Sequence, residues 1–318
     1  MKLSIIIPCY HESSAVRDTL ARLQESLRSA RFDDPYEVVF VDDGSRDDTF
    51  VHLKELAATH PGVRVLKLSA NVGSHMAIRA GLEHAGGTHA CYLPADLQEP
   101  PELIPRLMEL CREPVQIAWA VRDSRQDPAL TKFFARCFYG LARIMVTRNL
   151  PAEGAGTFLL GPKALAAVSS FPERNLTLEG LFATMGFPMA VLPYERQARK
   201  HGGSKWTLAK KLKLFADFFV AYSYTPIRFF SYLGVGVASL GFLYASYIFV
   251  ARLIYGSQMT SGFTAIMIAV LILGGLQMIM MGVLGEYLWR TLDESRRRPR
   301  YIVDEDVKGT TSSSSPSG

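Results

Sequence analysis

The sequence predicts an α/β domain with a mostly parallel sheet, followed by two transmembrane helices. In the first 200 residues or so, strand-like apolar runs alternate with segments of helical periodicity. This pattern is typical of parallel sheets covered by helices on both faces. Further on, no Asp, Glu, Lys or Arg occurs between Arg228 and Arg252, or between Arg252 and Glu286. Each stretch exceeds the ~20 apolar residues that cross a bilayer core of ~30 Å.

The composition of the 318 residues agrees with a chain that is partly in a membrane. Hydrophobic side chains make up 48% of the sequence and the mean hydropathy is +0.11, which argues against a purely soluble protein. We expect no secretory signal, because the first apolar run, 3–8, is short and charge soon follows it. The four cysteines lack CxxC spacing, so neither a zinc site nor a disulfide framework is expected, as in a reducing cytosol.

Strands and helices are expected to alternate along the first part of the chain. The apolar runs 3–8, 37–41, 63–68 and 90–93 predict four strands. Apolar residues spaced i, i+4, i+7 and i+11 predict the first helix, and Ser13 or Ser14 would be its N-cap. These apolar residues are Val16, Leu20, Leu23 and Leu27. A second helix is expected after Asp47, a third after Gly73 and a fourth at Pro100 and Pro101, which the first helical turn tolerates.

Polar clusters follow three of these strands, at 10–12, 42–43 and 94–98. The carboxyl ends of parallel strands form the ligand-binding edge of an α/β sheet, so the three clusters indicate one site. Each cluster alone is explained as well by a turn or a helix cap. Neither a Gly-x-Gly-x-x-Gly fingerprint after the first strand nor a Walker loop is present, which argues against dinucleotide and P-loop sites.

Four ordered motifs resemble the family 2 inverting glycosyltransferases, whose GT-A domain is Rossmann-like. They are Ile7-Pro8-Cys9-Tyr10-His11-Glu12, Val41-Asp42-Asp43-Gly44-Ser45-Arg46-Asp47, Asn71-Val72-Gly73 and Asp96-Leu97-Gln98-Glu99-Pro100-Pro101-Glu102. Later segments are similar to polyprenyl-phosphate glycosyltransferases, relatives of dolichol-phosphate mannose synthase. These are Val121-Arg122 with Arg125, Pro172-Glu173-Arg174-Asn175, and 199–206. The two apolar helices also resemble the bacterial branch that glucosylates undecaprenyl phosphate.

The resemblance implies a role for each matching position. The donor nucleotide would be bound by Pro8, Tyr10, Glu12 and Asp43, with Asp42 adjacent. Asp96 and Gln98 would hold Mg²⁺ or Mn²⁺ on the donor pyrophosphate, and Arg199, Ser204 and Lys205 would close over that pyrophosphate. Arg122, with Arg125 and Lys132, would receive the acceptor phosphate. Asp96 and Arg122 are therefore the candidate catalytic residues. Forked arginine donors suit phosphate, and hard oxygen ligands suit these cations.

Two positions depart from the family pattern. Pro94 stands where relatives have the first carboxylate of Asp-x-Asp, and Thr157 stands where they commonly carry a proposed catalytic base. Glu153 is a candidate substitute for that base. A base is dispensable if the acceptor is a phosphate monoester, whose second pKa lies near ~6 and which is already largely dianionic at pH 7.

The resemblance and the charge pattern together predict four regions. A GT-A domain would span 1–204, an interfacial amphipathic helix 205–227, and two spans about 229–251 and 263–285 within 228–289. A basic tail with a disordered Ser-rich end would occupy 290–318. Basic residues flank the pair of spans on both outer sides, with Arg252 alone between them, so both termini are expected in the cytoplasm. Glycines in the second span allow a homo-oligomer. No nucleic-acid partner is expected, because basic residues cluster at the membrane boundary.

The resulting hypothesis is a metal-dependent enzyme of the bacterial inner membrane. It would transfer one sugar from a nucleotide-diphosphate sugar, expected to be UDP-glucose, to undecaprenyl phosphate, with inversion at the anomeric carbon. Three alternatives remain: a non-catalytic lipid- or nucleotide-binding relative, because of Pro94 and Thr157; a processive polysaccharide synthase, which normally has more spans and a Gln-x-x-Arg-Trp motif; and a two-span flippase subunit.

Overall fold

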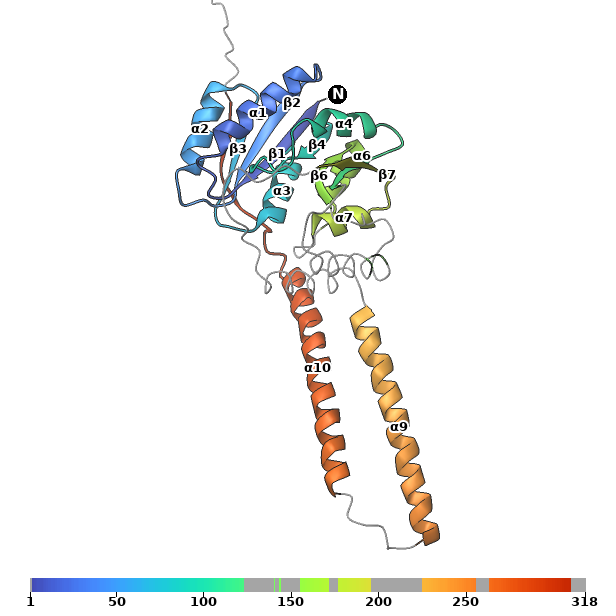
Figure 1. Cartoon of the computed structure of the whole chain (residues 1–318). Helices are drawn as coiled ribbons and strands as arrows, with labels where there is room; N and C mark the ends of the chain where they lie inside the picture. Colours follow the sequence, from blue (N-terminus) through green and yellow to red (C-terminus); the bar gives the residue numbers. More distant parts are fainter. Residues whose placement is uncertain are drawn as a thin grey trace, which may run out of the picture. The chain divides into compact units, whose positions relative to one another are not determined.

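A computed structural model describes residues 2–122, 140, 143, 155–171, 177–195, 225–255 and 263–309. The chain divides into two compact units (Figure 1). The sheet unit contains Met1–Lys211 together with Pro299–Gly318, and the helix unit contains Leu212–Arg298.

The sheet unit is built on eight strands in the order β7-β5-β6-β4-β1-β2-β3-β8. The strands are β1 (Leu3–Cys9), β2 (Tyr36–Asp42), β3 (Val63–Leu68), β4 (His89–Tyr92), β5 (Ile117–Arg122), β6 (Ala155–Leu160), β7 (Met189–Tyr194) and β8 (Val303–Lys308). Four pairings are parallel, namely β1 with β2 and β4, β2 with β3, and β5 with β7. The pairings β4–β6, β5–β6 and β3–β8 are antiparallel. The predicted mostly parallel α/β sheet is confirmed.

Helices cover both faces of this sheet (Figure 1). They are α1 (Val16–Ser29), α2 (Thr49–Thr59), α3 (Ser74–Glu83), α4 (Leu103–Leu110), α6 (Pro162–Val168) and α7 (Leu178–Thr184). Leu3, Ile5 and Ile7 of β1 pack in one core with α1, α2 and α4. Ile6, between them, packs in a second core with α3, α6 and α7. Because side chains alternate along a strand, burial on both faces explains why β1 is apolar at almost every position.

The four strands and four helices expected in the first part of the chain are all present, but two helix starts differ in detail. The cap of α1 is Ala15, whose side chain cannot accept a hydrogen bond, so the expected cap at Ser13 or Ser14 is wrong. Asp48 precedes α2 as its N-cap, while Asp47 Oδ1 accepts the backbone N–H of Thr49. Asp47, which lies one residue before the N-cap and not at it as expected, thus helps to satisfy an otherwise unpaired donor of the first helical turn.

Strand β8 changes the expected picture of the C-terminal region. Residues 290–318 were expected to form a basic tail, whereas 303–308 pair antiparallel with β3 at the edge of the sheet. Ion pairs connect β8 to its neighbour β3: Arg64 with Asp306, and Lys67 with Asp304 and Glu305. Alternating half-buried and exposed residues give β8 only one apolar face. The acidic residues of β8 pair with the basic residues of β3. These partners are distant in sequence, since Arg64 and Asp306 are 242 residues apart.

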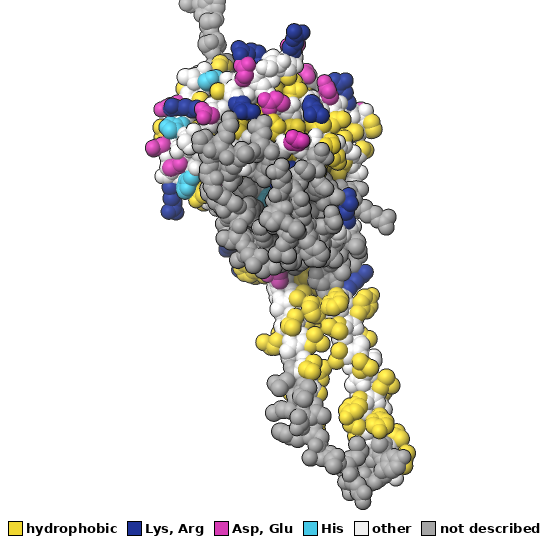
Figure 2. Space-filling model, viewed as in Figure 1, with side chains coloured by type: hydrophobic (Ala, Val, Ile, Leu, Met, Phe, Trp, Pro, Cys, Tyr) yellow, Lys and Arg dark blue, Asp and Glu magenta, His cyan; other side chains and the backbone are white. Residues whose placement is uncertain are grey.

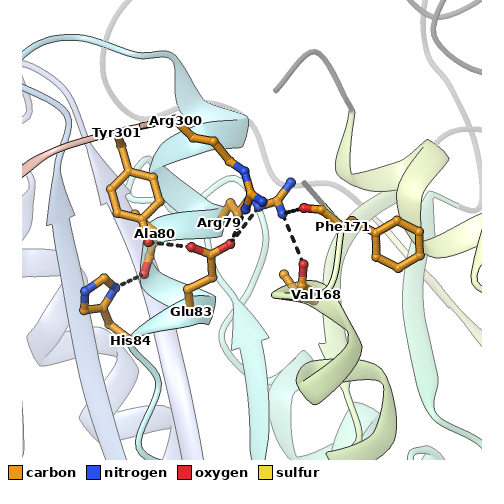
Figure 3. Close-up of polar contacts among 8 residues, drawn as sticks. All are labelled: Arg79, Ala80, Glu83, His84, Val168, Phe171, Arg300 and Tyr301. Atoms are coloured by element: carbon orange, nitrogen blue, oxygen red, sulfur yellow. Dashed lines mark hydrogen bonds and ion pairs between the residues drawn. The ribbon is translucent and has the colours of Figure 1, made fainter. Parts of the chain in front are cut away.

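A cluster of buried charge fixes the chain just before β8 to helix α3 (Figure 3). Arg79 is fully buried, and its Nε donates to Glu83 Oε1 at 2.9 Å. Arg300 donates to the same oxygen at 2.8 Å, and the Tyr301 hydroxyl donates to Oε2 at 2.6 Å. The second arm of Arg79 donates to the carbonyls of Val168 and Phe171. The Arg79–Glu83 pair therefore joins α3 to the end of α6, to the turn after it and to the C-terminal segment.

The helix unit consists of α9 (Thr225–Tyr255) and α10 (Phe263–Ser295), which contact each other. The stretches Ile227–Ile248 and Ile272–Ser295 are long and apolar enough to cross a membrane, and none of the side chains described within them is buried. Hydrophobic side chains lie over the surface of these helices, whereas charged side chains gather on the sheet unit (Figure 2). Exposed apolar surface of this extent marks a membrane or protein contact. Helices α9 and α10 include the expected spans of about 229–251 and 263–285, and the crossing of a membrane by these stretches stays a prediction.

Close packing between α3 and the sheet yields a first prediction. A Cβ added at Gly81 would lie 2.2 Å from Ile6 Cγ2 and 3.1 Å from Val41 Cγ2. We expect Gly81→Ala to destabilise the sheet unit by about 1–3 kcal/mol, since overpacking outweighs the gain in helix propensity. Gly62→Ala is the control, because its Cβ would meet only the Tyr36 carbonyl at 3.7 Å. Urea unfolding followed by circular dichroism measures both, and equal stabilities would contradict the packing argument.

Candidate active site

The loops that follow β1 and β2 are bonded to each other at the carboxyl edge of the sheet. The backbone N–H of His11 donates to Ser45 Oγ at 3.0 Å, and that of Glu12 donates to Thr49 Oγ1 at 3.0 Å. Tyr10 is partly exposed, and its ring stacks on His11 with centroids 4.1 Å apart. The first two polar clusters of the sequence therefore meet, as expected, and they present an aromatic surface beside several polar groups.

Asp43 organises a third segment of this edge, the loop before α3. Its Oδ1 accepts the N–H of Val72 at 2.8 Å, and its Oδ2 accepts the N–H of Gly73 at 3.0 Å. This close approach of the two loops requires glycine at 44, where φ is +67° and a Cβ would lie 2.6 Å from the Ala70 carbonyl carbon. Asp43 thus has a structural role that the sequence did not indicate, in addition to the expected role in nucleotide binding.

Asp42 is completely buried at the end of β2. Its Oδ1 accepts the N–H of Ser45 at 3.2 Å, while its buried Oδ2 has no hydrogen-bond partner within the described part of the chain. Burial raises the pKa of Asp42, and hydrogen bonds with Ser45 oppose this shift. Burial likewise raises the pKa of Asp43, opposed by the hydrogen bonds from Val72 and Gly73. An unpaired buried carboxylate oxygen is suited to a hydroxyl donor from a ligand, and it reduces stability while it has none.

This buried charge gives a pH-dependent prediction. A raised carboxyl pKa in the folded state adds stability at low pH, and that stability is lost as the pH rises through the folded-state pKa. Asp42→Asn removes the buried charge, so the variant should melt above the wild type at neutral pH, by roughly 2 °C or more. The gap should shrink as the pH falls from about 8 to about 4. Thermal melts across this range measure the effect, and a gap that widens at low pH would contradict it.

The loop after β4 carries the candidate metal ligands. Asp96 Oδ1 accepts the N–H of Gln98 at 3.2 Å, and Leu97 between them has φ +53°. The Ala95 carbonyl accepts a hydrogen bond from Thr19 of α1, which anchors the loop. No group of three or more His, Cys, Asp or Glu side chains forms a metal site in the described ranges. One carboxylate and one amide oxygen still fit Mg²⁺ or Mn²⁺, because such ions often take their remaining ligands from substrate phosphates and water.

A further carboxylate, Glu99, lies next to this loop and is nearly inaccessible to solvent. Its Oε2 accepts both the backbone N–H and the hydroxyl of Thr157, which is fully buried on β6. The sequence motif contains Glu99, but nothing in its local pattern assigned it a role, because its partner is 58 residues away. Thr157 stands where the family pattern has a carboxylate, and in the structure it is hydrogen-bonded to the carboxylate of Glu99.

The remaining expected residues divide between described and undescribed parts of the chain. Pro8 lies in β1, and Arg122 ends β5, opposite Tyr194 of β7 in the parallel register. Arg125, Lys132, Glu153, Arg199, Ser204 and Lys205 lie outside the described residues, as does most of the expected interfacial helix at 205–227.

Two family models match this chain. One, described as glycosyl transferase family 2, covers residues 4–171, and the other, the GtrB C-terminal hairpin, covers 225–290. The chain belongs to glycosyl transferase family 2. The second match covers most of α9 and α10, so it identifies the helix pair as a recurrent part of such chains. The GT-A-like fold expected from the sequence agrees with this membership.

The relatives are similar over nearly the whole chain. An uncharacterized glycosyltransferase of Synechocystis sp. is 34% identical over 306 residues, which is 96% of this chain and 95% of the relative. The bactoprenol glucosyl transferase of Shigella phage SfV is 34% identical over 310 residues, or 96% of this chain and 99% of the relative. A solved mannosyltransferase of Pyrobaculum calidifontis, in complex with GDP-Man and Mn²⁺, is 19% identical at a TM-score of 0.49, covering 90% and 87% of the two chains.

Proposed function

We propose that this protein transfers glucose from UDP-glucose to undecaprenyl phosphate, with inversion, to give a lipid-linked glucosyl monophosphate. The observation that carries the proposal is the extent of the similarity to a bactoprenol glucosyl transferase, which includes both the catalytic region and the helix pair. A transferase that acts on a soluble acceptor has no need of two helices with the length and exposed apolar surface of α9 and α10.

The described residues support a division of the site into a donor side and an acceptor side. On the donor side, the loops of Tyr10, Asp42 and Asp43 would bind the nucleoside, and Asp96 with Gln98 would hold the divalent cation. A bound Mg²⁺ or Mn²⁺ would neutralise charge on the leaving diphosphate. On the acceptor side, Arg122 would bind the lipid phosphate, with Arg125 and Lys132 contributing from the following segment.

The proposed reaction is a single displacement at the anomeric carbon. An oxygen of the lipid phosphate forms a bond to that carbon while the bond to the β-phosphate oxygen breaks, and UDP leaves with the electron pair. The acceptor is already largely dianionic at neutral pH, so no proton has to be removed from it. The protein then contributes mainly by aligning two anionic reactants and screening their charge. Under this account Thr157 does not need to act as a base.

The location proposed is the inner membrane of a bacterium, with both termini in the cytoplasm. The pairing of β8 with β3 supports this topology, because the chain before α9 and the chain after α10 belong to one sheet unit. Both ends of the helix pair must then lie on one side of the membrane. Arg228 near the start of α9 and Arg296, Arg297 and Arg298 after α10 favour the cytoplasmic side. The glycines of α10 are consistent with self-association, which remains a proposal.

The test uses the full-length protein in nanodiscs and a panel of labelled donors: UDP-glucose, UDP-galactose, UDP-N-acetylglucosamine and GDP-mannose. We expect label to enter the organic phase from UDP-glucose only, and only when undecaprenyl phosphate is present. Nucleotide binding without transfer from any donor would favour a non-catalytic relative. Products that carry several sugars per lipid would favour a processive synthase.

A further inference from the structure

His11 lies in the loop after β1 and has a backbone conformation that few residues adopt. Its φ is +55°, in the left-handed region, where His, Asn and Asp occur more often than other residues with a side chain. The residue is exposed, so its imidazole exchanges protons directly with solvent. The expected donor-binding residues Tyr10 and Glu12 stand on either side of it in the chain. His11 therefore belongs to the cluster that is expected to bind the nucleotide.

Two hydrogen bonds connect His11 to the loop after β2, one donated and one accepted. Its backbone N–H donates to Ser45 Oγ at 3.0 Å, and its ring Nε2 accepts the backbone N–H of Arg46 at 3.2 Å. Ser45 in turn donates its own backbone N–H to Asp42 Oδ1. The imidazole also stacks on the Tyr10 ring, with 18° between the two planes. One residue thus connects the exposed aromatic ring to the segment that carries the buried carboxylate.

The hydrogen bond from Arg46 requires a neutral imidazole. A ring nitrogen accepts a hydrogen bond only when it carries no proton, whereas both nitrogens of the imidazolium are donors. Protonation of His11 at Nε2 would therefore set two N–H groups against each other, and this bond between the loops would be lost. Histidine side chains change charge between about pH 5 and pH 8. The connection between the two loops is thus expected to depend on pH.

A second histidine contacts the same loop in a way that does not depend on its charge. Nδ1 of His52, on α2, lies 2.9 Å from the Ser13 carbonyl oxygen. Because a carbonyl oxygen can only accept, this nitrogen donates, and it still carries its proton in the imidazolium. His52 therefore keeps its hydrogen bond at low pH, whereas His11 does not.

Other titratable or charged groups near the imidazole come from both loops. Asp47 is close enough to interact with the imidazolium charge. Burial raises the pKa values of the carboxyl groups at the end of β2, against the hydrogen bonds that these groups accept. Any contribution of these neighbours to a pH profile persists when His11 alone is changed. The full set is Tyr10, Glu12, Asp42, Asp43, Arg46 and Asp47.

We propose that His11 is a positioning residue for the donor nucleotide, which holds the Tyr10 ring and the loop after β2 together only while its imidazole is neutral. The inference rests on the proposed function and concerns its donor side. A sugar nucleotide that binds at Tyr10 and Asp42 would meet connected loops at pH 8 and loops with one connection fewer at low pH. The affinity for the donor should fall by about 3- to 10-fold, as expected for one lost hydrogen bond.

The experiment measures binding of UDP-glucose with Mg²⁺ to the full-length protein in nanodiscs, without acceptor, from pH 8 to about pH 5.5. UDP-glucose does not titrate in this range, so a change in Kd belongs to the protein. For the wild type we expect the Kd to rise about 3- to 10-fold as the pH falls. In His11→Gln the amide oxygen can accept the N–H of Arg46 and does not titrate. Its Kd should stay near the wild-type value at pH 8 and change less than about twofold.

Two further variants separate this role from general damage. His52→Gln should keep the wild-type dependence on pH, because the charge of His52 does not affect its hydrogen bond. If His11→Gln loses its melting transition, His11→Asn replaces it, since asparagine adopts a positive φ readily, and its Kd should also be independent of pH. A wild-type Kd that does not rise at low pH, or an equal rise in the folded His11 variant, would overturn the inference and leave the proposed function intact. A wild type that binds no UDP-glucose at any pH would overturn both.

Discussion

Asp96→Ala should reduce kcat for glucose transfer by at least about 100-fold, a typical loss when a group that stabilises transition-state charge is removed. The reason is the small number of protein ligands available to the cation. With Pro94 in the preceding position of the motif, Asp96 is the only carboxylate of the Pro94–Gln98 segment. Its loss would leave the amide of Gln98, a weak ligand for a hard cation. Transfer of labelled glucose at saturating donor and acceptor measures the effect.

The matched control is Asp33→Ala, which removes an exposed carboxylate from the loop between α1 and β2. It should keep wild-type activity. Removing the metal with EDTA should abolish transfer in the wild type, and adding Mn²⁺ or Mg²⁺ should restore it. If Asp96→Ala kept more than about a third of the activity, or if EDTA had no effect, the metal assignment would be wrong.

Glu83→Gln should be the most destabilising of the substitutions considered, lowering the free energy of unfolding by about 3 kcal/mol or more. The carboxylate of Glu83 balances Arg79, which is fully buried, and also binds Arg300 and Tyr301. Removing its charge takes away the carboxylate that these two neighbouring guanidinium groups share. The carbonyls of Val168 and Phe171, which also accept hydrogen bonds from Arg79, carry no net charge. Urea unfolding in detergent, followed by circular dichroism, measures the loss.

Glu55→Gln is the control for Glu83→Gln, because Glu55 also pairs with an arginine. The Arg17–Glu55 pair lies on the surface, with both side chains more than half exposed, and such pairs contribute about 0–1 kcal/mol. Hydrogen exchange adds a second readout. In Glu83→Gln the amides of β8 should exchange faster than those of β1, because the fixed point before β8 is lost. Equal destabilisation by both variants would contradict a special role for the buried cluster.

The sequence predicted the first half of the sheet well because its signals are local. Every residue of β1 except Pro8 is buried, and such strands show as uninterrupted apolar runs. The same reasoning placed the polar clusters at one edge, where hydrogen bonds from His11 and Glu12 to Ser45 and Thr49 now join two of them.

Features that depend on distant partners were not predictable in the same way. Strand β8 has the sequence Val-Asp-Glu-Asp-Val-Lys, which lacks an apolar run, and its stability comes from pairing with β3 and from the Arg64–Asp306 ion pair. Glu99 was part of a recognised motif, yet its contact with Thr157 follows from the antiparallel pairing of β6 with β4. The hydrogen bonds that Asp43 accepts from the backbone of Val72 and Gly73 likewise depend on tertiary packing.

The central claim is that a glucosyl group, and not a glucosyl phosphate, passes to the lipid phosphate. The measurement that tests it most directly is the identity of the released nucleotide and of the lipid product in one reaction. Full-length protein with UDP-glucose and undecaprenyl phosphate should release one UDP for each glucose that enters the lipid. Mass spectrometry should then show a lipid with a single phosphate. Release of UMP with a diphosphate-linked lipid, or nucleotide binding without any lipid product, would contradict the account.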